Sequence, residues 1–286
     1  MLRAYLAGAR AAARRWPLIV ILWLITATFG LAFALATAAW LSDALEGSLA
    51  TRAVFRTVDP DVLIDLWYHH REGLRALLVL GFVLAAVHTV LWWWLDGVVI
   101  SSLQRPGHEP LTLRLSRGGV WAEGLEVAPA MAQLFAIAIA LLALFSGAVG
   151  GAAYALLRWT RTDPAAMIWY QIGGVAAAVW AIGCVFLVAV HDQARIRVCR
   201  ARQQALPAYR WALGFVLRGG ERAFPLACAL QLTGVGLWLA AYAVDTGFTM
   251  AAALGPTGAL LWGEAVLWLR LWVRVWFFAA QNELQL

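Results

Sequence analysis

Two titratable residues lie in the middle of long apolar runs, where a side chain that can ionise is unusual. His88 belongs to the run 76–100, and Glu264 belongs to the run 251–278. An ionised side chain at the centre of a bilayer costs roughly 2.5–3.5 kcal/mol on insertion scales, so such positions are candidates for function. Both runs are expected to cross in the same direction, which places the two side chains at similar depth. Together they could relay a proton or bind a cation.

The alternative for this pair is a structural role, and it is the interpretation that we favour. Each side chain would then be satisfied by local contacts and would hold helices together. The replacement Glu264→Gln separates the two interpretations, because it should abolish a pH-dependent or ion-dependent activity only if the pair takes part in that activity.

Arginines near the ends of the apolar runs form a second group of candidates. Guanidinium groups bind phosphate and carboxylate through paired hydrogen bonds, so these residues could contact anionic lipid or a partner protein. For Arg270 and Arg274 we favour a simpler role, namely snorkelling to lipid phosphates or pairing with Asp96 or Asp192. The candidate arginines are Arg195, Arg197, Arg200, Arg202, Arg210, Arg218, Arg270 and Arg274.

Sequence motifs of known catalytic and cofactor-binding sites are missing. There is no P-loop, no HExxH, no GxSxG and no paired acid motif within an apolar run. Cys184, Cys199 and Cys228 do not have the spacing of a metal site or indicate a disulfide. His88 is the only central histidine, so haem ligation by two histidines is not expected. We predict a protein that is not an enzyme and that binds no cofactor or metal.

The composition predicts an integral membrane protein. Of the 286 residues, 63% are hydrophobic and 13% are charged, against roughly 45–50% and about 25% in soluble proteins. The formal net charge of +6 is explained by arginine-rich loops on one side of a membrane, so we expect no nucleic-acid partner. The bilayer itself is the first expected partner.

The apolar runs predict six transmembrane helices, because about 20 apolar residues are needed to cross roughly 30 Å of hydrocarbon. Two amphipathic helices are expected beside them: an external interfacial helix at about 60–72, and a cytoplasmic helix at about 207–218 with its aromatic residues and its arginines on different faces. The fold class is an all-α polytopic membrane helix bundle, with one domain over 1–286. The six runs are 17–41, 76–100, 130–157, 167–190, 224–244 and 251–278.

The distribution of arginine predicts the topology. The segment 191–222 contains seven of the 22 basic residues, and basic loops are retained in the cytoplasm. With this segment inside and six crossings, sixteen arginines lie on the inner side and six on the outer side. Both termini are then cytoplasmic, and the first apolar run is an uncleaved helix, because it is too long for a signal peptide.

Small residues recur at a spacing of four in several runs. Gly147 and Gly151 form a GxxxG pair, and Gly173 and Ala177 continue this spacing in the next run. Such positions let two helix backbones approach closely. These contacts could form within one chain or between copies, so a homo-oligomer is one expected assembly.

Two short motifs resemble those of a loose set of bacterial multi-pass membrane proteins of unassigned function. The motifs are WWWLDGVVISSL at Trp92–Leu103 and HDQARIRV at His191–Val198, the second followed by a surface helix that contains alanine and arginine. The resemblance implies six helices and a place in the bacterial inner membrane. It implies no particular activity.

Two functions from different classes follow from these observations. The first is a non-catalytic membrane subunit or scaffold that docks a partner protein or anionic lipid through its arginine-rich cytoplasmic segment. The second is a permease for a small solute or lipid with a site near His88 and Glu264. We favour the first, because polar groups within the runs are few and no inverted repeat is evident.

Overall fold

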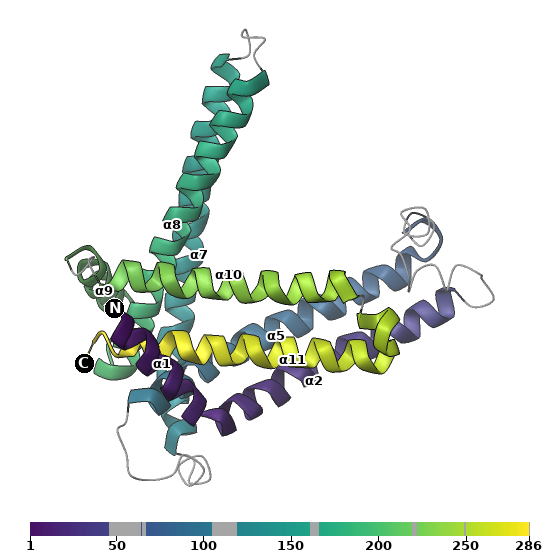
Figure 1. The fold of residues 1–286 in the computed structure, drawn as a ribbon, viewed down its shortest axis with the longest axis horizontal. Helices are drawn as coiled ribbons and strands as arrows, with labels where there is room; N and C mark the ends of the chain where they lie inside the picture. The colour runs from purple at the N-terminus through teal and green to yellow at the C-terminus, as the bar shows by residue number, and fades with distance from the viewer. Residues whose placement is uncertain are drawn as a thin grey trace. The chain divides into compact units, whose positions relative to one another are not determined.

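All regular structure in the described part of the chain is helical. The computed structural model describes residues 1–45, 64, 67–104, 119–160, 166–218, 222–248 and 250–285. The all-helical prediction is confirmed for these residues. The helices are α1 (Leu2–Arg14), α2 (Trp16–Ala44), α5 (Arg71–Gln104), α7 (Gly119–Trp159), α8 (Ala166–Ala201), α9 (Ala205–Arg218), α10 (Ala223–Phe248) and α11 (Met250–Asn282) (Figure 1).

Five helices are long and apolar enough to cross a membrane, namely α2, α5, α7, α8 and α10. They support the prediction of a multi-pass membrane protein. The sixth predicted span, 251–278, lies in α11, which is not among these five; the side chains of 251–257 and 259 are outside the described part. A count of six therefore stays a prediction. The predicted external helix at 60–72 also falls mostly outside the described residues.

The chain divides into two compact units, and each is described separately. One unit is Val20–Trp92, and the other combines Met1–Ile19 with Trp93–Leu286. In the smaller unit, α2 and α5 pack closely at two glycines. A Cβ atom on Gly73 would lie 2.0 Å from Nε1 of Trp40, and one on Gly81 would lie 3.0 Å from the Phe33 ring. A side chain at either position would therefore force the ring of Trp40 or Phe33 to move.

The helices of the larger unit are longer than a bilayer requires. At 1.5 Å per residue, the 41 residues of α7 and the 36 residues of α8 extend for about 60 Å and about 54 Å, against roughly 30 Å of hydrocarbon. The sequence predicted one span that begins at residue 130 and another that ends at residue 190 and continues as a helix to about Gln204. In the structure α7 begins at Gly119 and α8 ends at Ala201. Each helix therefore continues well past its apolar run.

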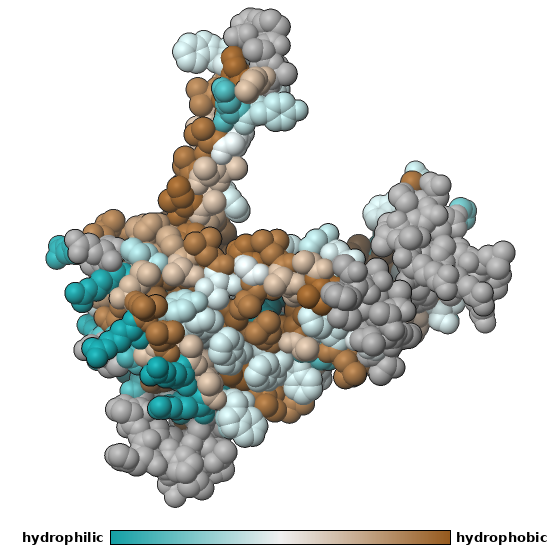
Figure 2. All heavy atoms as spheres, viewed as in Figure 1, coloured by the Kyte–Doolittle hydropathy of each residue, from teal (hydrophilic) through white to brown (hydrophobic). Residues whose placement is uncertain are grey.

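These extensions form the buried core of the larger unit, which we call the helix-end core. It contains the end of α5, the start of α7, the end of α8, the start of α10 and the end of α11, together with α1 and α9. Leu95, Leu134, Ile196, Leu226 and Ala280 are all fully buried in it. Figure 2 shows hydrophilic residues around α9, α1 and the chain ends, and hydrophobic residues along α7 and α8.

Helix α1 was not predicted from the sequence. It ends at Arg15, and α2 then begins with Pro17 in its first turn, a position that proline tolerates because no helical N–H is lost there. One face of α1 packs on α11, where Gly8 lies so close to Ala280 that an added Cβ would come within 2.6 Å. Tyr5 also stacks edge-on against Trp276, with ring centroids 4.7 Å apart.

Helices α5 and α7 make a second close contact in the helix-end core. A Cβ atom on Gly97 would lie 2.6 Å from Val127 Cγ2 and 3.0 Å from the Gly124 carbonyl oxygen. Nε1 of Trp94 donates a hydrogen bond of 3.0 Å to the Trp121 carbonyl. The two backbones thus meet at a pair of glycines.

Helices α7 and α8 lie side by side along their apolar halves (Figure 1). Nε1 of Trp180 donates a hydrogen bond of 2.9 Å to Ser146, and Gly183 lies against the ring of Phe145. The small residues singled out in the sequence are not used in this contact. A Cβ atom on Gly147 or Gly173 would meet no atom within 4 Å in the described chain.

Candidate functional site

The helix-end core contains a buried network of charged residues from three helices. Asp96, on α5, is 1% exposed and accepts two hydrogen bonds from Nη2 of Arg274, on α11, at 2.8 and 3.0 Å. Arg195, on α8, forms a second ion pair with the same carboxylate. One aspartate therefore joins α5, α8 and α11.

The network continues along α8 and α11. Asp192, one turn before Arg195, pairs with it at 3.5 Å and accepts a hydrogen bond of 2.9 Å from Nε2 of Gln281. Oε1 of Gln281 accepts from Gln193 at 3.3 Å, and Gln285 donates to Oε1 of Gln193 at 2.6 Å. An amide side chain thus donates to the carboxylate of Asp192, and the amides together link α8 to the end of the chain.

The charges of this network balance within the protein. Two carboxylates, Asp96 and Asp192, face two guanidinium groups, Arg195 and Arg274. The guanidinium of Arg195 also lies 5.1 Å from the ring centroid of Phe278, a cation–π contact that strengthens when water is excluded. A buried pair of this kind adds little net stability, but removing one partner is costly, so the network fixes the positions of the helices.

Tyr209, on α9, packs next to this network. Its ring centroid lies 6.3 Å from that of His191. Burial raises the pKa of Tyr209 to about 12, and the negative charge of Asp192 adds to the shift. The hydroxyl therefore stays neutral at physiological pH. It has no hydrogen-bond partner among the described residues.

The eight candidate arginines fall into two groups in the structure. Arg195 and Arg274 belong to the network, so the pairing of Arg274 with Asp96 is confirmed. The side chain of Arg195 is 15% exposed and that of Arg274 is 39% exposed. Arg197 donates to Gln203 at 3.4 Å and lies over the Trp211 ring at 4.7 Å. The others have exposed side chains and are Arg200, Arg202, Arg210, Arg218 and Arg270.

Two exposed arginines border a groove on α9. The groove has a volume of about 470 Å³ and is lined by the set that we call the α9 surface: Arg210, Trp211, Gly214, Phe215 and Arg218. The rings of Trp211 and Phe215 stack at 5.0 Å. The prediction that the aromatic residues and the arginines occupy different faces is therefore wrong. The opposite face of α9 is buried and contains small residues, Ala205, Ala208 and Ala212, which leaves the aromatic rings beside the arginines.

The two titratable residues of the apolar runs lie in different units. In the smaller unit, Nε2 of His88 accepts a hydrogen bond of 2.7 Å from Nε1 of Trp92, and the imidazole lies 5.2 Å from the ring centroid of Phe29. The acceptor role of Nε2 places the proton of a neutral imidazole on Nδ1. Glu264 is half-buried on α11 in the larger unit. Their pairing stays a prediction.

The described part of the chain contains no cluster of three histidine, cysteine or acidic residues that could hold a metal ion. Cys199 is buried, whereas Cys184 and Cys228 are half-buried, and all three are thiols. The expectation that the protein binds no cofactor stays an expectation.

From the sequence, the glutamines of the buried network were not identified, and Asp96 and Asp192 were considered only as possible partners of the arginines. Asp96 and Asp192 occur in similar short motifs, LDGVVI and HDQARI, each with an isoleucine four residues after the aspartate. This similarity was too short to indicate that both residues share one network. Gln193 and Gln281 had no signal of their own, although a run of polar residues directly after a long apolar helix could have suggested a buried polar end.

Comparison with known protein families, curated proteins and solved structures finds no match for this chain.

Proposed function

We propose that the protein is a non-catalytic, multi-pass subunit or scaffold of the bacterial inner membrane that docks a partner protein or anionic lipid through its arginine-rich cytoplasmic segment. The observation that supports this function best is the construction of α9. One face of α9 is buried in the helix-end core, and the other exposes Leu206, Leu213 and Leu217 beside Arg210 and Arg218.

Exposed leucines beside arginines are typical of a surface that meets an anionic bilayer or a partner helix. Helix α9 follows candidate span α8 after three residues and precedes candidate span α10 after four, so it cannot lie far from the membrane. The carboxylates of the buried network pair with Arg195 and Arg274, so they do not neutralise Arg210 and Arg218. The α9 surface therefore keeps a positive charge that can attract a partner. These features support docking better than catalysis.

The proposed topology has six spans, with α11 as the sixth, and both termini in the cytoplasm. Its support comes from the larger unit, where the two chain ends lie near α9 (Figure 1). Arg200, at the end of α8, donates a hydrogen bond to the carbonyl of Gln285 near the C-terminus. An even number of crossings would return both ends to one side of a membrane, in agreement with this contact.

Co-purification from native membranes tests the docking function. The full chain should be recovered with a stoichiometric protein or with enriched anionic lipid, and the double variant Arg210→Gln with Arg218→Gln should lose most of it. Arg158→Gln is the matched control, because this arginine is exposed at the far end of α7 and should change nothing. Recovery of the wild-type chain with neither companion would overturn the proposal.

A permease is the second candidate, and one observation favours it. A groove of about 400 Å³ lies beside His88, lined by Phe29, Phe33, Gly81 and other small or apolar residues of α2 and α5. Such a groove could admit an apolar or weakly polar solute. If the chain transports through His88 and Glu264, Glu264→Gln should abolish pH-dependent or ion-dependent uptake into proteoliposomes. Unchanged uptake in a folded variant excludes a proton relay at Glu264.

A further inference from the structure

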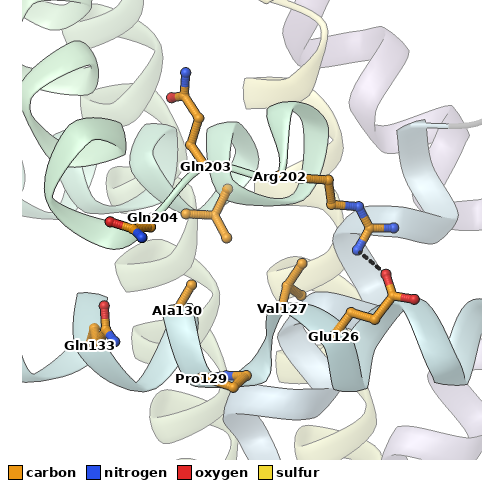
Figure 3. A pocket seen from close by; sticks show the side chains of 9 residues that line it. Glu126, Val127, Pro129, Ala130, Gln133, Arg202, Gln203 and Gln204 are labelled. Atoms are coloured by element: carbon orange, nitrogen blue, oxygen red, sulfur yellow. Dashed lines mark ion pairs between the residues drawn. The ribbon is translucent and has the colours of Figure 1, made fainter.

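A third hollow lies beside the turn between α8 and α9, and none of its lining residues belongs to the α9 surface. Its volume is about 550 Å³, and it is lined by the start of α7, the end of α8 and the turn that follows α8 (Figure 3). Val127, Ala130 and Val198 give it an apolar floor. The rim is polar and contains both signs of charge together with three amides: Arg202, Glu126, Gln133, Gln203 and Gln204.

Arg202 has an unusual backbone conformation for an arginine. Its φ of 50° is the only positive value among the non-glycine residues described, and it follows the last residue of α8, where a left-handed helix end normally has glycine. A side chain makes this conformation less favourable than it is for glycine. Backbone conformation alone would favour glycine at position 202, so the presence of arginine indicates that its side chain has a role.

The contacts that Arg202 makes within the chain are too weak to explain why arginine occupies this position. Its Nη1 lies 3.0 Å from Oε2 of Glu126 and 3.3 Å from the carbonyl oxygen of Glu123. The side chains of Arg202 and Glu126 are 43% and 67% exposed, and an exposed ion pair contributes little stability. Two opposite charges held 3.0 Å apart at the edge of a hollow are instead suited to a ligand that has both charges itself.

We infer that this hollow binds a zwitterionic group, a phosphate joined by a short link to a primary ammonium, such as the headgroup of phosphatidylethanolamine. The planar guanidinium of Arg202 takes the phosphate oxygens, and the carboxylate of Glu126 accepts from the ammonium. Gln133 and Gln204, which face Arg202 and Glu126 across the hollow in Figure 3, add donors and acceptors. The net charge of the site does not change on binding.

The position of the hollow suits a lipid headgroup. It lies at the start of α7 and at the end of α8, two candidate spans, and so at the same end of both helices. The apolar floor is suited to the glycerol end of the lipid, and the polar rim is suited to the charges. A soluble phosphoethanolamine has the same chemistry without the acyl chains, so the two sources need separate measurements.

Native mass spectrometry of the full chain, released from nanodiscs that contain equal amounts of three lipids, tests this site. Phosphatidylethanolamine should be retained over phosphatidylcholine, whose quaternary ammonium has no N–H to donate. In the variant Arg210→Gln with Arg218→Gln, which removes anionic-lipid binding at the α9 surface, it should also be retained over phosphatidylglycerol, which has no cation. Glu126→Gln should lower this retention about tenfold, as expected for the loss of a charge-assisted hydrogen bond. Arg158→Gln is the control and should retain lipid as the wild type does.

Arg202→Gly separates a ligand role from a structural role. Glycine suits the left-handed backbone, so the thermal midpoint should not fall, while retention of phosphatidylethanolamine should fall about tenfold. Displacement of the lipid by added phosphoethanolamine would identify a small soluble ligand, and failure to displace it would identify the lipid.

Equal retention of phosphatidylethanolamine and phosphatidylcholine by the wild type would overturn the inference. Unchanged retention in both Arg202→Gly and Glu126→Gln would do the same. The site shares no lining residue with the α9 surface, so Arg210→Gln with Arg218→Gln should leave the preference for phosphatidylethanolamine over phosphatidylcholine intact. Failure of one proposal therefore leaves the other standing.

Discussion

At the residue scale, Asp96 and Asp192 are the two buried aspartates of the described chain, and Asp96 is the one that joins three helices. Its carboxylate is almost fully buried and contacts two guanidinium groups that come from α8 and α11. A buried charge that loses its partner retains the whole penalty of desolvation, whereas the intact pair is close to neutral in free energy. The stability of the helix-end core should therefore be far more sensitive to loss of Asp96 than to loss of a surface carboxylate.

The replacement Asp96→Asn tests this expectation. It leaves Arg195 and Arg274 without their shared negative charge and should lower the free energy of unfolding by about 3–5 kcal/mol. The measurement is tryptophan fluorescence of the purified protein in detergent during a titration with denaturing detergent.

Asp43→Asn is the control, because Asp43 is exposed near the end of α2 and should change stability by less than about 0.5 kcal/mol. Combining Asp96→Asn with Arg274→Gln should cost less than the sum of the two single changes, because both remove one interaction. Equal effects of Asp96→Asn and Asp43→Asn would show that the network does not stabilise the core.

At the element scale, glycines divide into two kinds according to what surrounds them. Gly8, Gly97 and Gly124 lie where two helices touch and leave no room for a side chain. Gly147 and Gly151, and Gly150 between them, lie in the apolar half of α7 and have open space around the position of a Cβ. The GxxxG spacing in the sequence marked the second kind, and the contacts in the described chain use the first.

Gly97→Ala and Gly150→Ala should therefore change stability in opposite directions. The first places a methyl group 2.6 Å from Val127 Cγ2 and 3.0 Å from a backbone oxygen, and should destabilise the protein by about 1–3 kcal/mol. The second meets nothing and should stabilise α7 by about 0.5–1 kcal/mol through helix propensity. The same unfolding titration measures both, and destabilisation by Gly150→Ala would reveal a contact made by another copy.

At the scale of the whole molecule, the buried surface lies at the ends of the helices rather than along their apolar lengths. Lipid can cover apolar side chains, so the spans do not need to bury them against each other. Outside the hydrocarbon, helices gain from burying apolar area away from water. The helix-end core is where this gain is available, and it places α9 and the zwitterion site at the ends of α7 and α8.

Cysteine labelling tests the topology in intact cells. In a background without the three native cysteines, Arg3→Cys and Arg200→Cys should be protected from a maleimide that cannot cross membranes, and Trp159→Cys should react. All three positions are exposed, so differences in labelling report the side of the membrane rather than burial. Labelling of residue 200 from outside would reverse the predicted orientation and with it the site of docking.

The sequence by itself was sufficient for the class of protein and for most helices. Runs of about 20 apolar residues must be helical in lipid, because no water is present to satisfy an exposed backbone. Even the continuation of α8 past its apolar run could be predicted from the sequence. The same reasoning missed α1 and the start of α7, since both are ordinary amphipathic or mixed segments whose helical form depends on packing against α11 and α5.

Only the tertiary structure decided which charges meet. Asp96 and Arg274 are 178 residues apart in the chain, and hydropathy says nothing about how one helix is rotated against another. From the sequence, Arg274 was expected either to snorkel to lipid phosphates or to pair with Asp96 or Asp192, and the structure shows the pair with Asp96. The choice among them followed from packing, because glycine contacts bring α5 and α7 together and a buried carboxylate is stable only where guanidinium groups from two other helices reach it.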